Sequence, residues 1–156
     1  MTSSAEERLA ELGLKLPAPP PAVANYVGAV RSGNLVFVSG HGPYRDGQYQ
    51  YIGKVDSQVP VEDAYKSAQL TILNALASLK AEIGSLDRVR KVVKLFGMVN
   101  SDLGFGRQPE VINGASDVLV HVFGDRGKHA RSAVGLGALP MGISIEIEMV
   151  VEIEAE

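Results

Sequence analysis

The clearest pattern in the chain is an alternation of apolar and polar residues close to its C-terminus. Every second residue from Ile143 to Ile153 carries a large apolar side chain, and Glu146 and Glu148 occupy two of the positions between them. Successive side chains of a β-strand point to opposite faces of a sheet. The pattern therefore predicts a strand with one face in the core and the other in water or in an enclosed polar space.

Two other segments show the three- and four-residue spacing that is typical of amphipathic helices. The first is predicted over 61–83, and its apolar face consists of Tyr65, Ala68, Ile72, Leu76, Leu79 and Ile83. The second is predicted over about 109–123, and its apolar face consists of Val111, Ala115, Val118 and Val122. A proline stands at the start of each segment and a glycine follows each, which is the usual arrangement at helix ends.

Further strands are predicted in four apolar segments, at 26–31, 35–39, 88–100 and 130–139. The segment 44–60 is predicted to be a loop with at most one short strand. The order ββαβαββ predicts an α+β domain of two layers, with both helices on one face of a mostly antiparallel sheet. The second face and the edge strands of such a sheet need partners, so we expect several subunits to associate around a closed, barrel-like core.

The N-terminal segment differs in character from the rest. Ser3 or Ser4 can cap a short helix that ends near Gly13, and the proline-rich sequence 16–21 follows it. Such a sequence favours a stiff, extended spacer over a polyproline ligand for a partner domain. The predicted organisation is therefore a leader over 1–20 and a single domain over 21–156.

The composition excludes several classes of site. The chain has no cysteine, which rules out a disulfide scaffold, a thiol nucleophile and zinc–thiolate or iron–sulfur centres. Its three histidines do not have metal-ligand spacing, and no glycine-rich phosphate loop is present. The sequence therefore indicates none of these metal or phosphate sites. The net charge of −3 argues against bulk capture of nucleic acid. No signal peptide or membrane-spanning run is visible, so a cytoplasmic location is expected.

Arg131 is unusual because it lies inside an apolar strand. By alternation it shares a face with small residues such as Ala133 and Gly135, which leaves space around its guanidinium. A guanidinium in such a space can bind a carboxylate through two hydrogen bonds, and a salt bridge to Glu146 or Glu148 is an equally good interpretation.

Two other positions have competing interpretations. Glu146 belongs either to a solvated acidic edge or, if other subunits enclose the sheet, to a site in which it acts as a base. Its pKa could then be raised by burial or lowered by Arg131. Ser39 and His41 place a hydroxyl near an imidazole, but a strand that ends in a turn is the favoured interpretation over a nucleophile–base pair.

Two stretches of the sequence resemble the RidA/YjgF/YER057c/UK114 family. The first is Tyr26 followed by Asn34-Leu35-Val36-Phe37-Val38-Ser39-Gly40. The second is Ala130-Arg131-Ser132-Ala133-Val134, followed by Leu139-Pro140 and Ile145-Glu146-Ile147-Glu148. The resemblance implies a chorismate-mutase-like fold and a homotrimer with sites between subunits. It also implies hydrolysis of reactive 2-imino or enamine acids to 2-keto acids and ammonia, without a metal or organic cofactor.

The resemblance also implies roles for individual residues. Arg131 would bind the substrate carboxylate, and Glu146 would hold or activate the attacking water. The cleft would be lined by Tyr26, Ser39, Gly40, His41, Asn113 and Ala133. The chain departs from many deaminase members at Ala133, where they carry cysteine, and at His41, where they often carry glutamine.

Two alternatives to a deaminase follow from the same residues. The first is a trimer that binds small carboxylates without catalysis, since Arg131 is retained in a remodelled pocket. The second, less favoured, is a ribonuclease or translation inhibitor. The basic stretch over 88–94 is its only support, and no aromatic side chains for base stacking accompany that stretch.

Overall fold

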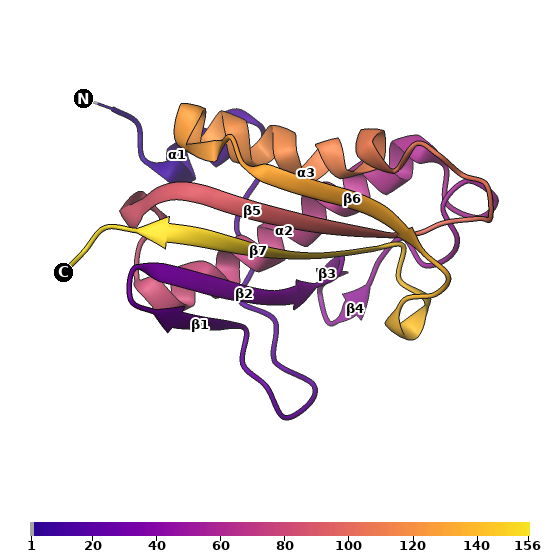
Figure 1. Ribbon diagram of the computed structural model, residues 1–156, viewed down its shortest axis with the longest axis horizontal. Helices are drawn as coiled ribbons and strands as arrows, with labels where there is room; N and C mark the ends of the chain where they lie inside the picture. Colours follow the sequence, from indigo (N-terminus) through magenta and orange to yellow (C-terminus); the bar gives the residue numbers. More distant parts are fainter. Residues whose placement is uncertain (1) are drawn as a thin grey trace.

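The computed structural model of the chain describes residues 2–156, which form a layer of helices on a five-stranded sheet (Figure 1). The helices are α1 (Ala5–Glu11), α2 (Val61–Ile83) and α3 (Gln108–Phe123). The strands of the large sheet are β1 (Ala29–Ser32), β2 (Leu35–His41), β5 (Val89–Asn100), β6 (Ala130–Leu136) and β7 (Ile145–Ile153). A small separate hairpin is formed by β3 (Tyr44–Arg45) and β4 (Gln48–Tyr49).

The large sheet has the strand order β1-β2-β7-β5-β6. Its neighbouring strands are antiparallel except for β5 and β6, which are parallel because α3 crosses over between them. The predicted α+β class and mostly antiparallel sheet are therefore confirmed. The 3-10 turns Leu86–Arg88, Gly124–Gly127 and Pro140–Gly142 connect elements at the ends of the sheet.

The helices cover one face of the sheet, and the alternation of β7 explains how. Ile145, Ile147 and Met149 are almost fully buried on the face that the helices cover. Helix α2 has the predicted bounds and ends at Gly84, whose φ of 87° is favourable only for glycine. The apolar stripe of α2 packs on this face and on α3.

The opposite face of the sheet is open in a single chain. It carries the glutamates of β7, and Phe37 of β2 pairs with Val150 of β7 in the antiparallel register. Phe37 remains 48% exposed and Val30 on the neighbouring β1 is 52% exposed. Large exposed apolar side chains grouped on one face are typical of an interaction surface. Association through this face stays a prediction.

The predicted strands differ from the observed ones at their ends. β1 begins at Ala29 rather than at Tyr26, because the backbone before it leaves the sheet and projects as a loop (Figure 1). The segment predicted as a loop over 44–60 contains the β3–β4 hairpin, so it holds two short strands rather than at most one. β6 ends at Leu136, before the predicted end at Leu139.

The N-terminal segment packs on the rest of the chain. Ser4 caps α1 in a reciprocal capping box with Glu7. Leu9 of α1 is 1% exposed and belongs to the same buried cluster as the sheet and the two long helices. Leu14 and Leu16 also pack against that cluster. The beginning of the proline-rich segment is therefore tied to the core.

Candidate functional site

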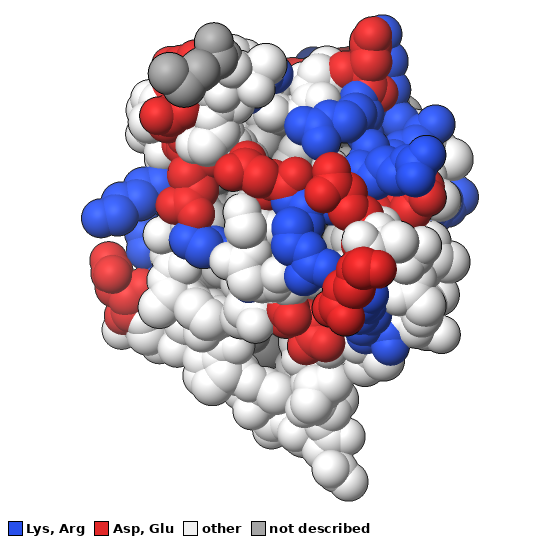
Figure 2. Space-filling model, turned by 90° about the vertical axis from the view of Figure 1, so that its left-hand side faces the viewer, with Lys and Arg blue, Asp and Glu red and all other residues white. Residues whose placement is uncertain are grey.

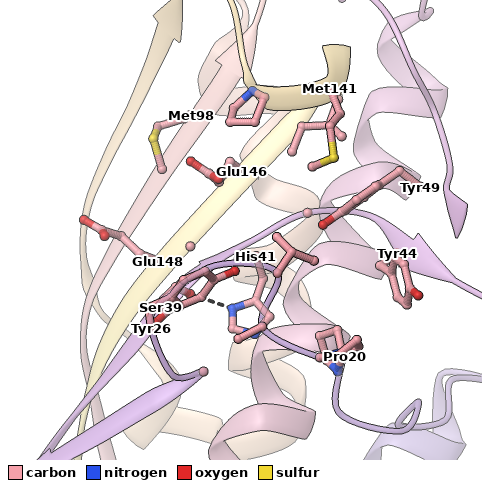
Figure 3. Close-up of a pocket in the computed structure, with 18 of the residues that line it drawn as sticks. Pro20, Tyr26, Ser39, His41, Tyr44, Tyr49, Met98, Met141, Glu146 and Glu148 are labelled. Carbon is pink, nitrogen blue, oxygen red and sulfur yellow. Dashed lines mark hydrogen bonds between the residues drawn. The ribbon is translucent and has the colours of Figure 1, made fainter. Parts of the chain in front are cut away.

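A pocket of about 650 Å³ opens on the side of the sheet that the helices leave uncovered. Five of the predicted site residues line it, namely Tyr26, Ser39, Gly40, His41 and Glu146. They come from the loop before β1, from the end of β2 and from β7 (Figure 3). The fold thus brings together residues that are up to 120 positions apart in the sequence.

A β-bulge at the end of β2 shapes the floor of this pocket. Val38 pairs with Met149 and His41 with Ile147, so β2 has one more residue than β7 over this stretch. A Cβ atom on Gly40 would lie 3.1 Å from the carboxyl carbon of Glu146. The absence of a side chain at position 40 therefore allows the Glu146 carboxyl group to lie against the β2 backbone.

The bulge turns His41 towards α2. Its Nδ1 lies 2.5 Å from the carbonyl oxygen of Ser39, and its Nε2 lies 2.8 Å from the hydroxyl oxygen of Ser78 (Figure 3 shows the first contact). A carbonyl only accepts, so Nδ1 carries the proton and Nε2 accepts from Ser78. Burial lowers the pKa of His41, against the opposing effect of the Ser39 carbonyl. His41 is therefore a neutral ring with both nitrogens in use.

Ser39 and His41 do not form a nucleophile–base pair. The Ser39 hydroxyl donates to the carbonyl oxygen of Val27 at 2.5 Å, and the His41 ring bonds to the carbonyl oxygen of Ser39 rather than to its hydroxyl. The Ser39 side chain thereby links the end of β2 to the loop that contains Tyr26. The favoured interpretation, a strand that ends in a turn, agrees with this geometry.

Glu146 is the half-buried carboxyl group of the pocket. Burial raises its pKa above the ordinary value, and the negative charge of Glu148 raises it further. Of the two directions left open by the sequence, the one caused by burial holds in the single chain. A carboxyl group with a raised pKa takes up a proton more readily than an ordinary one, which favours a role in proton transfer.

The sequence did not indicate the other walls of the pocket. Tyr44 and Tyr49 of the small hairpin stack edge to face with ring centroids 5.2 Å apart, and Phe96, Met98 and Met141 add an apolar side. Pro20 and Pro21, predicted to be part of a spacer, also line the pocket. Three tyrosines between positions 44 and 51 were a signal, but nothing in their spacing placed them beside Glu146.

Arg131 lies elsewhere, on the face of the sheet that carries the helices. It pairs in register with the buried Leu95, and its Nη1 donates to Asn113 Oδ1 at 2.8 Å and to Ser116 Oγ at 3.1 Å. Both acceptors belong to α3. Glu146 and Glu148 extend from the other face of the sheet, into the pocket. The guanidinium therefore has no ion pair with either of them within residues 2–156. The salt-bridge interpretation of Arg131 is therefore wrong for the single chain.

The rest of the guanidinium is free. Within the described part of the chain, neither Nε nor Nη2 of Arg131 donates a hydrogen bond. Those two nitrogens form an edge of the guanidinium to which both oxygens of a carboxylate can bind. Ala133 follows on the same face, where it packs against the core. Gly135 leaves less space than expected, because Ser101 Oγ and Gln108 Nε2 would lie within 3 Å of a Cβ atom there.

The candidate residues thus form two groups on opposite faces of one chain. The pocket group is Tyr26, Ser39, Gly40, His41 and Glu146. The arginine group is Arg131, Asn113 and Ala133, where Asn113 is the direct partner of Arg131. A single chain does not bring the predicted pair Arg131 and Glu146 together.

Comparison with known families agrees with this arrangement of strands and helices. A family model described as "YjgF/chorismate mutase-like, putative endoribonuclease" matches residues 6–152. The chain belongs to this family. The resemblance inferred from the two sequence stretches is therefore confirmed, and so is the chorismate-mutase-like fold.

Three YjgF-like relatives illustrate how far the similarity extends. Protein TCP17 of Trypanosoma cruzi is 40% identical over 146 residues, which are 93% of this chain and 91% of that protein. The crystal structure of Atu1372, a protein of unknown function from Agrobacterium tumefaciens, is 44% identical with a TM-score of 0.89 and covers 96% of this chain and 92% of that one. A structure from Shewanella oneidensis MR-1, described as a "putative endoribonuclease", is 30% identical with a TM-score of 0.93, covering 97% of this chain and all of that one.

The charges at one end of this YjgF-like chain are mixed. Figure 2 shows Lys and Arg side chains interleaved with Asp and Glu on that face. In the basic stretch, Arg88 Nη2 lies 3.8 Å from Glu156 and Arg90 Nε lies 3.9 Å from Glu152. These carboxylates offset the positive charge that an RNA backbone would need. Among residues 2–156, no helix has both the length and the apolar character to cross a bilayer; the cytoplasmic location stays a prediction.

Proposed function

We propose that the chain hydrolyses 2-imino or enamine acids in sites formed between copies of itself. In each site, the pocket of one protomer faces the arginine group of its neighbour. The observation that carries this proposal is the unpaired Nε–Nη2 edge of Arg131, combined with a pocket whose ionisable side chains include Glu146 and Glu148 but no lysine or arginine. The arginine group supplies a cation for the substrate carboxylate, and the pocket group supplies a carboxyl group for proton transfer at the electrophilic C=N carbon.

The chemistry divides between the two groups. The Arg131 fork binds the substrate carboxylate through two hydrogen bonds and so fixes the position of the C=N carbon. Glu146 takes a proton from a water molecule as its oxygen attacks that carbon. The same carboxyl group returns that proton to the nitrogen, which gives a carbinolamine. It then takes the remaining hydroxyl proton and passes it to the nitrogen as the C=O bond forms and the C–N bond breaks, so that ammonia and a 2-keto acid leave.

The first test measures ammonia release. Purified protein is given 2-imino acids that an amino-acid oxidase generates in the assay, and the rate is compared with that of Arg131→Ala. We expect the variant to lose about 10²-fold or more in kcat/KM, because it lacks the charged partner of the carboxylate. Arg107→Ala is the matched control, since Arg107, the residue just before α3, forms its one ion pair among residues 2–156 with the exposed Glu110.

The outcomes of this test separate the candidate functions. Equal rates for wild type and Arg131→Ala would contradict the proposed mechanism. If neither protein accelerates hydrolysis, but wild type binds 2-keto acids in calorimetry and Arg131→Ala does not, the chain is a carboxylate-binding protein instead.

A second test asks whether Arg131 of one copy faces Glu146 of another. A positive charge within about 4–6 Å lowers a carboxyl pKa by about 1–3 pH units. The Glu146 pKa in the assembled protein should therefore be higher in Arg131→Ala than in wild type. Carbon-13 NMR of protein labelled at glutamate carboxyls measures it, with Glu146→Gln identifying the signal. Identical titration curves in the two proteins would show that the groups do not meet.

A further inference from the structure

One residue outside the predicted site, Ser116, contacts Arg131 from the helix side, and a second, His129, contacts Ser116. Ser116 of α3 accepts a hydrogen bond from Arg131 Nη1 at 3.1 Å, and the Ser116 hydroxyl oxygen also lies 2.9 Å from Nε2 of His129. The other ring nitrogen of His129, Nδ1, lies 2.6 Å from the carbonyl oxygen of Gly127. These three contacts link the 3-10 turn before β6, helix α3 and the guanidinium in one row.

The direction of each hydrogen bond in this row follows once the His129 ring is neutral. The Gly127 carbonyl can only accept, so His129 Nδ1 donates to it. The guanidinium can only donate, so the oxygen of Ser116 accepts from Arg131. When His129 is neutral, its Nε2 carries a lone pair, and the Ser116 hydroxyl donates to it.

The surroundings of His129 keep it in that neutral form. Burial lowers its pKa, and the positive charge of Arg131 lowers it further, while the bond to the Gly127 carbonyl opposes both effects. Neutral His129 thus accepts the Ser116 proton and holds the hydroxyl in one orientation. In that orientation a lone pair of the hydroxyl oxygen is directed at Arg131.

The row also determines which edge of the guanidinium is offered to a ligand. Nη1 donates to both Asn113 and Ser116. With Nη1 engaged by α3, the edge formed by Nε and Nη2 has no acceptor in the described residues. An arginine held in this way loses less conformational freedom when it binds a carboxylate than a freely rotating arginine does.

We propose that Ser116 and His129 are positioning residues that act through Arg131 and set the affinity of the site for the substrate carboxylate. The proposal rests on the proposed function, because it assumes that Arg131 binds that carboxylate. Ser116 and His129 themselves contact no substrate. Their effect is to aim the Nε–Nη2 edge away from α3.

The test is a double-mutant cycle on carboxylate affinity. Calorimetry with 2-oxobutyrate measures Kd for wild type, Ser116→Ala, Arg131→Ala and the double variant, and melting temperature checks the fold. Ser116→Ala should raise Kd by about three- to tenfold, and KM in the ammonia assay should rise with little change in kcat. In the Arg131→Ala background the same substitution should have no further effect. Ser116→Thr, which keeps the hydroxyl, should restore the wild-type Kd.

His129→Leu provides the second arm of the test. It removes the acceptor of the Ser116 proton and replaces the ring with an apolar side chain of similar size. It should raise Kd in the same direction as Ser116→Ala, and again only when Arg131 is present. Additive losses in the Arg131→Ala background would assign both residues a merely structural role and overturn the proposal. If Arg131→Ala itself leaves Kd unchanged, the proposed function fails first, and the positioning role fails with it.

Discussion

A mixture of two inactive variants is expected to regain activity. Arg131→Ala should lack carboxylate binding, and Glu146→Gln should lose about 10²–10⁴-fold in kcat because an amide cannot take up the proton of the attacking water. Co-expressed in equal amounts and assembled at random, the two chains should form intact sites at about a quarter of the interfaces of a cyclic oligomer. At those interfaces, the Arg131→Ala chain provides Glu146 and the Glu146→Gln chain provides Arg131.

The expected recovery follows from the position of the two groups on opposite faces of the sheet. Arg131 donates to α3, whereas Glu146 lines the pocket on the uncovered face. Neither side chain can reach the other around the sheet in one chain. If each site were instead formed within one chain, every chain in the mixture would carry a defect, and the mixture would be as inactive as its components.

The control for this experiment is a mixture of wild-type chains with chains that carry both substitutions. The same random assembly then leaves intact interfaces only where two wild-type chains meet, again about a quarter of the total. Ammonia release per chain should therefore be similar in the two mixtures. Activity in the control mixture but none in the test mixture would contradict the shared site.

The sequence predicted the elements whose pattern repeats over many residues. The helix over 61–83 and the alternation of the last strand were placed correctly, because periodic burial against a single core face determines both. The small β3–β4 hairpin was missed, since two strands of two residues each are too short to show a period. The start of β1 was placed three residues early because Tyr26 and Val27 look like strand residues but belong to the projecting loop.

The candidate site was predictable only in part, for a different reason. The types of residue at positions 131 and 146 pointed to carboxylate binding and proton transfer, but a sequence does not show on which face of a mixed sheet each strand presents its side chains. Arg131 lies on the helix face because β6 runs parallel to β5 and pairs Arg131 with buried Leu95. The positioning role of Ser116 and His129 was invisible in the sequence, since it depends on the tautomer of a ring fixed by the Gly127 carbonyl.

Gly114→Ala is expected to lower the free energy of unfolding by about 2–4 kcal/mol. Gly114 lies in α3 where that helix crosses α2, and a Cβ atom there would lie 2.1 Å from the carbonyl oxygen of Tyr65. Alanine in a helix interior is favoured over glycine by about 1 kcal/mol, so propensity alone predicts stabilisation. The overlap is with backbone, which cannot rotate away, and should outweigh that gain. Urea unfolding followed by circular dichroism measures the change.

Gly106→Ala is the matched control, because no atom beyond its two chain neighbours lies within 4 Å of the position that its Cβ atom would occupy. It should leave stability unchanged or raise it by less than about 1 kcal/mol. An equal loss in both variants would show that the helix crossing is not as close as described.

Gly114→Ala also connects the packing of the helices with the site. Gly97 of β5 also lacks a side chain where α3 approaches, since its Cβ atom would lie 2.7 Å from Ile112. Two glycines therefore allow α3 to lie close to both α2 and the sheet, and Asn113 and Ser116 extend from this helix to Arg131. If Gly114→Ala displaces α3, the acceptors of Nη1 move with it. The folded fraction of the variant should then also bind 2-oxobutyrate more weakly, although residue 114 touches neither Arg131 nor the pocket.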